Sequence, residues 1–324
     1  MKALLAPLVA FFLAPSLLQA SHLPIKTYTT ADGLARDHIL RIFQDSHGFL
    51  WFGTAEGLSR FDGYQFTNYH TEQGLPSNFI SDFIETSQGV YWIATGGGLC
   101  RFDPTGAGPS RFLRYPLSGE HGRTAPSLLY EDRSGVIWCG ASSGDSGLFR
   151  LEPREVSFRR VDLRMTDPAV TALLMDRRGT LWVGSTDGLT RREPDGSTRR
   201  YTALGGLPSP FIMAMLEDRE GRLWVGTRIG LVRMDAAGES REPPRVRVYT
   251  RKDGLPSLRI ESLLQSSDGT LWVGTNEGLA RWIPGETPDG REFESYTLEQ
   301  GLSARSVGAL AEDRDGNLWV GTFG

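Results

Sequence analysis

One tryptophan recurs at nearly constant spacing along the whole chain. It stands at positions 51, 92, 138, 182, 224, 272 and 319, so that 41 to 48 residues separate each copy from the next. The fullest copy of the surrounding pattern runs over residues 218–227, from an Asp through a Gly to Leu-Trp-Val-Gly-Thr, and Gly230-Leu231 and Arg233 follow it. Periods of this size are typical of repeat folds, so the repeat must be explained before any local motif is interpreted.

Each repeat contains four short segments that favour β-strands. The first is apolar, as in Ile212–Leu216, and precedes an Asp and a Gly that suit a tight hairpin turn. The second carries the Trp, a Gly-Leu pair opens the third, and the fourth is β-branched and aromatic, as in Val246–Tyr249. The pattern predicts an all-β fold, a seven-bladed β-propeller of four-stranded antiparallel blades.

The tryptophans are interpreted as packing residues, because one indole at the same place in every blade fits the gap between neighbouring sheets. Burial of roughly 150–250 Å² of each ring, at about 25 cal/mol per Å², is worth ~4–6 kcal/mol. A recurring arginine follows the Gly-Leu pair and is expected to form strand-surface or inter-blade pairs. The structural tryptophans are Trp51, Trp92, Trp138, Trp182, Trp224, Trp272 and Trp319.

The two ends of the chain carry separate expectations. Residues 1–20 resemble an export signal, with Lys2 before an apolar run, so residues 21–324 are expected to be the exported propeller. Residues 24–30 resemble the end of a fourth strand and are expected to close the ring as an N-terminal strand. A Gly-Leu leucine after Trp319 would fall at position 326, so we expect an incomplete seventh blade and a fragment of a longer protein.

Composition and motifs argue against several functions. The formal charge of −4 and the absence of a basic run give no footprint for nucleic acid. The five histidines show no metal-ligand spacing, and the chain has no G-x-S-x-G nucleophile elbow. Gly96-Gly97-Gly98 lies between two expected strands and precedes no helix that would hold phosphate. We expect no catalysis, no metal and no cofactor in this chain.

Two stretches resemble the two-component regulator propeller repeat. They are residues 313–322, read Asp-Arg-Asp-Gly-Asn-Leu-Trp-Val-Gly-Thr, and residues 45–63 around Trp51. The resemblance implies the periplasmic sensor region of a membrane-bound regulator, whose histidine kinase or diguanylate cyclase lies elsewhere in a longer protein. It also implies a small-molecule ligand such as an oligosaccharide, homodimerisation through propeller faces, and membrane attachment only through a downstream region.

Two other classes of function stay open. The streptogramin lyase family is also a seven-bladed propeller, but it needs a catalytic His and metal ligands on one face, and four of the five histidines here lie in the first third of the chain. An exported protein-interaction scaffold is the third class. The ligand, the output domain and the oligomeric state are left open by the sequence.

Loops that enter the innermost strands are the expected ligand site. They follow a constant Gly-Leu pair, whereas their own residues vary between blades, and such variation on a fixed scaffold is where specificity can reside. Aromatic stacking and guanidinium hydrogen bonds suit a sugar or an acidic ligand. The expected ligand-binding residues are His38, Asn78, Phe79, Arg259 and Arg305.

Overall fold

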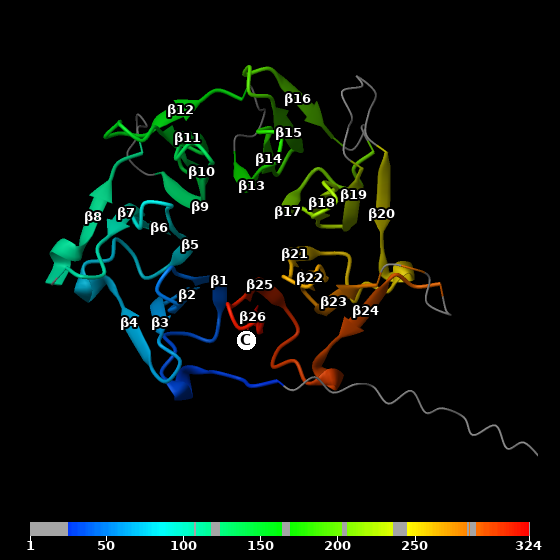
Figure 1. Ribbon diagram of the computed structural model, residues 1–324, viewed down its shortest axis with the longest axis horizontal. Coiled ribbons are helices and arrows are strands. Elements are labelled where there is room, and N and C mark those ends of the chain that lie inside the picture. The colour runs from blue at the N-terminus through cyan, green and yellow to red at the C-terminus, as the bar shows by residue number, and fades with distance from the viewer. Residues whose placement is uncertain are drawn as a thin grey trace, which may run out of the picture.

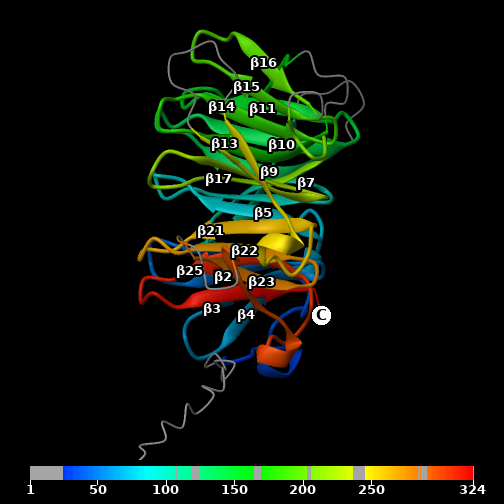
Figure 2. The ribbon, with the colours of Figure 1, turned by 90° about the vertical axis from the view of Figure 1, so that its right-hand side faces the viewer.

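The chain forms a flat ring of seven antiparallel sheets around a central axis (Figure 1). A computed structural model describes residues 25–106, 108–117, 124–163, 169–202, 206–235, 245–283, 285 and 290–323. Seen edge-on in Figure 2, the ring is a disc in which the sheets lie one above another. The expected export signal, residues 1–20, lies outside the described residues.

Six of the sheets, numbered here as blades 1 to 6 in chain order, have four strands each. In every one of them the strands neighbour one another in chain order. The strands are β1 (Ile39–Gln44), β2 (Leu50–Thr54), β3 (Gly57–Phe61), β4 (Phe66–Tyr69); β5 (Ile80–Glu85), β6 (Tyr91–Thr95), β7 (Gly98–Phe102), β8 (Phe112–Tyr115); β9 (Ala125–Glu131), β10 (Ile137–Ser143), β11 (Gly147–Leu151), β12 (Arg159–Val161); β13 (Val170–Met175), β14 (Leu181–Ser185), β15 (Leu189–Arg192), β16 (Thr198–Tyr201); β17 (Ile212–Glu217), β18 (Leu223–Thr227), β19 (Gly230–Met234), β20 (Val246–Tyr249); and β21 (Ile260–Gln265), β22 (Leu271–Thr275), β23 (Gly278–Trp282), β24 (Phe293–Tyr296).

The seventh sheet corrects the predicted fold. It contains two strands, β25 (Val307–Glu312) and β26 (Leu318–Thr322), so the prediction of seven four-stranded blades is wrong. The expected N-terminal closing strand is also wrong, because residues 25–29 form no strand. A strand is defined by a hydrogen-bonded neighbour, and the described residues place no strand between this segment and β26.

Short 3₁₀ helices lead from one blade to the next. Four of them, η1 (Thr30–Asp32), η2 (Thr71–Gln73), η5 (Arg251–Asp253) and η6 (Leu298–Gln300), share a capping box and a following glycine with φ between 101° and 110°. The capping box explains the spacing of Thr or His three residues before Asp or Gln, since each side chain accepts the other residue's backbone N–H. A fifth, η3 (Gly108–Arg111), precedes β8. None of the helices among the described residues is long and apolar enough to cross a bilayer.

The repeated Asp accepts a hydrogen bond from the repeated Trp. In five sheets its Oδ2 accepts the indole N–H of the Trp six residues later, at 2.7–2.9 Å. The other oxygen accepts backbone N–H groups two and four residues on, which forms the turn. Thr86 and Ser266 occupy this position in blades 2 and 6. The side chains of Trp51 and Trp224 are essentially inaccessible, with exposures of 1% and 0%.

Neighbouring blades are joined by side chains from these turns. Arg177 donates to the carbonyls of Asp218 and Arg219, and Arg219 donates to those of Ser266 and Ser267. The ring closes in the same way, because Arg314 donates to the carbonyls of Asp45 at 2.9 Å and Ser46 at 2.7 Å. These are turn arginines. The recurring strand arginines act inside their own blades, as in Arg191 with Glu193 at 2.6 Å and Arg281 with Glu294 at 2.6 Å.

Two of the turn carboxyls make stability depend on pH. Burial alone would raise the pKa of Asp132, but hydrogen bonds from Ser134 and Trp138 outweigh it and hold the pKa below the ordinary 3.8. Asp313 is lowered for the same reason, with Trp319 and Asn317 as donors. A lowered folded pKa contributes stability that is present above pH 3.8 and is lost as pH falls through the folded value.

We therefore expect Asp132→Asn to flatten the acid end of the stability profile. Urea titrations at a series of pH values below about 5 would show a smaller fall in unfolding free energy for the variant than for the native chain. Asp187→Asn is the matched control, since that carboxyl pairs with Arg200 on the blade surface. Equal slopes for native chain and Asp132→Asn would contradict the assignment.

Candidate functional site

Two sets of connections share one face of the disc, which is called the loop face below. It carries the loops that enter the innermost strands and the turns that join each second strand to the third. Backbone hydrogen bonds tie the two sets together: Gly96 N–H donates to Phe79 O at 2.9 Å, and Asn276 N–H donates to Arg259 O at 3.3 Å. The ring therefore gathers on one face positions that lie far apart along the chain.

Two of the five predicted ligand residues, Asn78 and His38, have side chains that contact other residues of the protein. The Asn78 Oδ1 accepts the backbone N–H of Thr71 at 2.8 Å, which fixes the start of η2. Asp37 does the same for Thr30 in the preceding blade, at 2.7 Å. His38 packs on the ring of Phe323, with ring centroids 4.3 Å apart. Burial lowers the pKa of His38, and the positive charge of Arg36 lowers it further.

The other three predicted residues present side chains to solvent on the loop face. Phe79 is 45% exposed in blade 2. Arg259 pairs through its Nε with the Glu261 carboxylate at 2.6 Å, and its side chain is still 47% exposed. Arg305 is exposed at the start of β25. Arg259 and Arg305 therefore stand on adjacent sheets, and Phe79 lies away from them in blade 2.

Sequence reasoning missed a fourth group on the same face. The Arg228 guanidinium lies over the ring of Phe211 at 3.7 Å from the centroid, and neighbouring Ile229 is 51% exposed. Arg228 and Ile229 belong to the turn between β18 and β19. The sequence could have indicated them, because in an antiparallel blade the turn after the second strand lies on the same face as the loop that enters the first strand. Arginines thus occur on the loop face of three consecutive sheets, at Arg228, Arg259 and Arg305.

The channel wall is polar but its polar groups are engaged in holding the blades. The seven innermost strands enclose a cavity of about 230 Å³. On its wall Arg41 of β1 pairs with Asp82 of β5 at 2.8 Å. Asp82 also accepts the N–H groups of Leu129 at 2.7 Å and Phe83 at 2.8 Å. Burial raises the pKa of Asp82, and Arg41 together with these donors opposes that rise.

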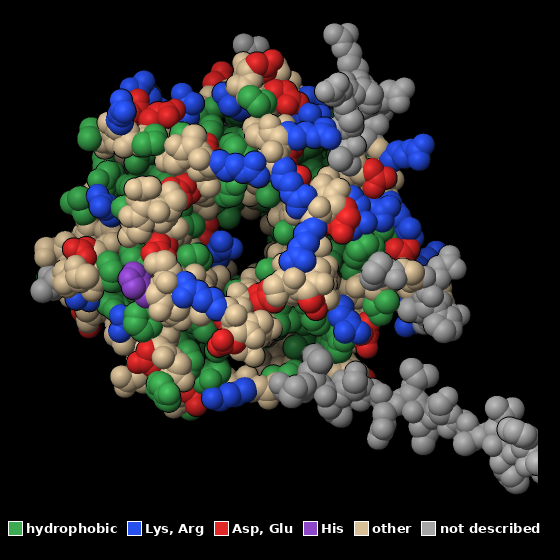
Figure 3. Space-filling view, viewed as in Figure 1, with side chains coloured by type: hydrophobic (Ala, Val, Ile, Leu, Met, Phe, Trp, Pro, Cys, Tyr) green, Lys and Arg blue, Asp and Glu red, His purple; other side chains and the backbone are tan. Residues whose placement is uncertain are grey.

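Figure 3 shows this channel open at the centre of the ring. Lysine and arginine side chains gather beside its mouth over β13, β17 and β21 on the face turned to the viewer. The hydroxyl groups of Ser81, Thr171 and Ser262 donate to backbone carbonyls of the next blade at 2.8, 2.6 and 3.2 Å. The polar side chains of the channel wall therefore mainly form hydrogen bonds and an ion pair that hold neighbouring blades together.

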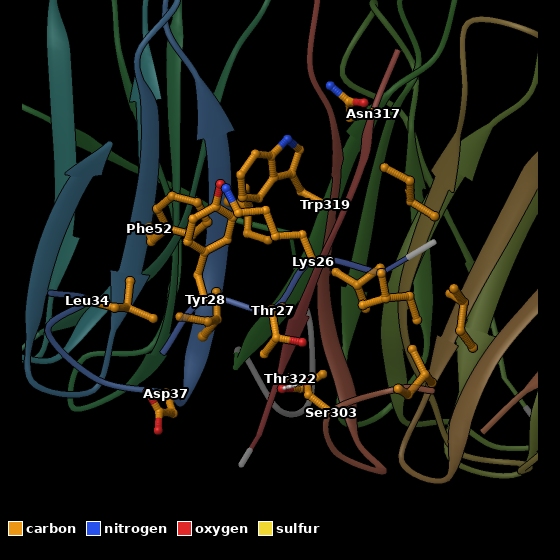
Figure 4. Close-up of a pocket in the computed structure, with 18 of the residues that line it drawn as sticks. Lys26, Thr27, Tyr28, Leu34, Asp37, Phe52, Ser303, Asn317, Trp319 and Thr322 are labelled. Carbon is orange, nitrogen blue, oxygen red and sulfur yellow. Dashed lines mark hydrogen bonds between the residues drawn. The ribbon is translucent and has the colours of Figure 1, made fainter. Parts of the chain in front are cut away.

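A second cavity of about 430 Å³ lies beside β26 and is called the edge pocket below. Residues 25–28 form one wall and residues 318–322 of β26 form the other. Figure 4 shows Tyr28, Phe52 and Trp319 side by side at one end and Ser303 and Thr322 at the other. The lining is mostly aromatic and aliphatic, which suits an apolar or flat occupant more than a charged one.

The described residues contain no group of three or more His, Cys, Asp or Glu side chains placed to hold a metal ion. Cys100 and Cys139 are buried free thiols, and burial raises the pKa of Cys100 to about 12. Thiols with such a pKa are not nucleophiles at neutral pH.

The repeated sequence and the ring of sheets define this chain as a β-propeller. The two component regulator propeller family matches residues 33–56, 74–97, 165–187, 206–228, 254–277 and 301–324. The chain belongs to that family. A histidine kinase P4 from Formosa agariphila is 46% identical over 56 residues, which are 17% of this chain and 4% of the kinase.

Two solved structures share the fold. One is the extracellular domain of BT3049 from B. thetaiotaomicron, described as a hybrid two component system, with a TM-score of 0.76 and 21% identity; the match covers 90% of this chain and 38% of that one. The other is virginiamycin B lyase from Staphylococcus aureus, with a TM-score of 0.67 and 16% identity over 89% and 92% of the two chains. At these identities the likeness concerns the fold alone. The chain spans only a small part of the kinase and little more than a third of the hybrid protein's domain.

Proposed function

We propose that this chain is the ligand-sensing propeller of an extracytoplasmic two-component sensor. The observation that carries the proposal is the family match, since the two component regulator repeat matches segments of six of the seven sheets. The fold shared with an extracellular domain of a hybrid two component system supports an exported location, after removal of residues 1–20. The chain acts by binding, and ligand contact or pairing of two propellers alters the output of a domain outside it.

The proposed ligand is a small hydroxylated or acidic molecule of the oligosaccharide class, bound on the loop face. Three observations support this choice. Arg228, Arg259 and Arg305 lie on the loop face of consecutive sheets, and guanidinium groups bind carboxylates and hydroxyls through several N–H donors. Phe79 offers an exposed ring for stacking on a sugar. The scaffold beneath is held by its own bonds, so these side chains can differ without disturbing the ring.

The test is a ligand screen followed by titration of one variant. Acidic and neutral oligosaccharides are screened by thermal shift, and affinity for the best ligand is measured by calorimetry. Arg305→Ala should weaken binding by at least fivefold, because one charge-assisted hydrogen bond is worth about 1.5–3 kcal/mol. Arg305 is preferred to Arg259, whose removal would also leave the Glu261 carboxylate without its ion-pair partner.

Arg114→Ala is the matched control, since Arg114 is exposed on the outermost strand β8 rather than on the loop face. Its affinity should equal that of the native chain. If Arg305→Ala and Arg114→Ala bind the ligand equally well, the loop face is not the site. If no oligosaccharide shifts the melting temperature, the proposed ligand class is wrong.

A further inference from the structure

Three consecutive blades carry paired arginines near the outer rim of the ring. In each of them the recurring arginine of the third strand lies directly opposite an arginine of the fourth strand. The pairs are Arg150 with Arg159 in blade 3, Arg191 with Arg199 in blade 4 and Arg233 with Arg247 in blade 5. Like charges at directly opposite positions of an antiparallel pair destabilise it. Each pair of arginines therefore needs carboxylates beside it.

Blades 3 and 5 have one carboxylate for each of these arginines. Three of the carboxylates belong to the same blade as the arginine, and the fourth reaches blade 5 from blade 6. The ion pairs are Arg150 with Glu152 at 3.3 Å, Arg159 with Glu155 at 2.6 Å, Arg233 with Asp235 at 3.3 Å, and Arg247 with Glu292 of blade 6. The positive charges of these two pairs of arginines are thus balanced inside the protein.

Blade 6 shows how a carboxylate is held at this place. Its third-strand Arg281 lies opposite Glu294 instead of an arginine. The Glu294 Oε2 accepts the hydroxyl of Tyr296 at 2.8 Å and an N–H of Arg281 at 2.6 Å. A tyrosine hydroxyl and a guanidinium therefore bind one carboxylate between them, and charge-assisted hydrogen bonds of this kind are strong.

Blade 4 has the tyrosine and the two arginines but only one carboxylate. Glu193 pairs with the Nε of Arg191 at 2.6 Å. Within the described part of the chain no carboxylate pairs with Arg199, whose guanidinium lies 5.4 Å from the ring centroid of Tyr201. Tyr201 is 5% exposed, and among the described residues its buried hydroxyl has no hydrogen-bond partner. A buried hydroxyl left in this way is costly, so the missing partner is significant.

The next blade supplies no carboxylate to this place. Tyr201 lies in the gap between blades 4 and 5, where it packs with Met234 and Val246. Blade 5 carries Arg245 at the position from which Glu292 of blade 6 reaches blade 5. The two positions are equivalent, since the carbonyl of each accepts the N–H of the residue after the third strand, at 3.1 Å for Arg245 and 2.8 Å for Glu292. An arginine thus replaces the glutamate that blade 6 provides.

We propose that Arg191, Arg199 and Tyr201, called the rim site below, bind a carboxylate group from a molecule outside the chain. Its oxygens accept the hydroxyl of Tyr201 and the N–H groups of Arg199, as Glu294 does in blade 6. Arg199 is exposed, so the ligand enters from solvent as this side chain turns away from the ring of Tyr201 and uncovers the hydroxyl. The rim site shares no residue with the loop face or the edge pocket, and the proposal does not depend on the sensing function.

The test is a titration of the full chain with sodium acetate, with chloride exchanged to keep the ionic strength constant. Binding is followed by the NMR signals of the arginine Nε–H groups, of which the signal lost in Arg199→Gln is that of Arg199. This signal should shift saturably in the native chain, and Arg199→Gln should weaken acetate binding at least tenfold. Arg159→Gln is the matched control, because Arg159 already pairs with Glu155, and its acetate affinity should equal that of the native chain.

A second variant supplies the carboxylate from within the chain. Arg199→Glu copies the arrangement of Arg281, Glu294 and Tyr296, so it should abolish acetate binding and melt at a higher temperature than Arg199→Gln. Glucuronate and glucose identify the source of the carboxylate. Tighter binding of glucuronate than of acetate, with none of glucose, would assign an acidic sugar, whereas equal binding of the two acids would assign a simple carboxylic acid.

Four results would overturn the proposal. They are the absence of a saturable shift at Arg199, equal acetate affinity of the native chain and Arg199→Gln, acetate binding by Arg199→Glu, and binding of sulfate as tight as that of acetate. The last result would show a general attraction of anions to arginine. The melting temperatures of the variants are independent of the ligand, so a variant that fails to fold is recognised before its affinity is interpreted.

Discussion

Asp82→Ala is expected to lower the unfolding free energy by at least about 2 kcal/mol, because it removes the acceptor of two backbone N–H groups, and each buried donor left without a partner costs about 1–3 kcal/mol. The carboxylate is almost fully buried, with a side-chain exposure of 4%. It binds Arg41 of blade 1 and the backbone of Leu129 in blade 3. Arg41 is 45% exposed and is solvated by water when Asp82 is removed, whereas the N–H group of Leu129 is left without an acceptor. Urea denaturation followed by tryptophan fluorescence measures the change.

The matched control is an exposed ion pair on the loop face. Arg36 and Glu56 lie 3.3 Å apart with side-chain exposures of 53% and 58%. Glu56→Ala should change stability by no more than about 1 kcal/mol, because exposed pairs are screened by solvent. Equal effects of Asp82→Ala and Glu56→Ala would show that Asp82 does not hold three blades together.

Asp218→Ala is the second substitution with a large expected effect, and it should lower the unfolding free energy by about 3 kcal/mol. Asp218 is 1% exposed and accepts the indole N–H of Trp224 at 2.7 Å, together with the backbone N–H groups of Glu220 and Arg222. Each buried donor left without an acceptor costs about 1–3 kcal/mol. Blade 6 has Ser266 at this place, so Asp218→Ser should cost less than Asp218→Ala. Thermal and urea unfolding rank the two variants, and a reversed order would contradict the role given to the Asp–Trp bond.

The strands could be predicted from the sequence because each has a local signal. Val246–Tyr249 is a strand over the predicted range, and the strand predicted at Ile212–Leu216 extends one residue further, to Glu217. An incomplete seventh blade was expected, but the failure of residues 25–29 to pair as its fourth strand could not be predicted in the same way. Residues 25–29 carry a fourth-strand sequence, but strand formation depends on a hydrogen-bonded neighbour, and a neighbour is not a property of the segment.

In the candidate site too, positions within a repeat could be predicted from the sequence, whereas contacts between separate segments could not. Variation between repeats identified Phe79, Arg259 and Arg305, which the structure places in contact with solvent. Asn78 also has a structural role that the sequence did not reveal, since its amide oxygen accepts a backbone N–H seven residues earlier, and a capping side chain and a ligand-binding side chain look alike in sequence. The contact of Arg228 with Phe211 was missed because it joins a turn to a loop across the blade.

The turn arginines have a consequence for how any signal leaves the molecule. Because each one reaches across a boundary and grips the carbonyls of its neighbour, adjacent wedges cannot shear without breaking several bonds together. We therefore expect the propeller to be rigid within the plane of its ring. Under the proposed sensing function, we therefore expect ligand binding to tilt or displace the propeller as one rigid body relative to its neighbouring domain, without deforming individual blades.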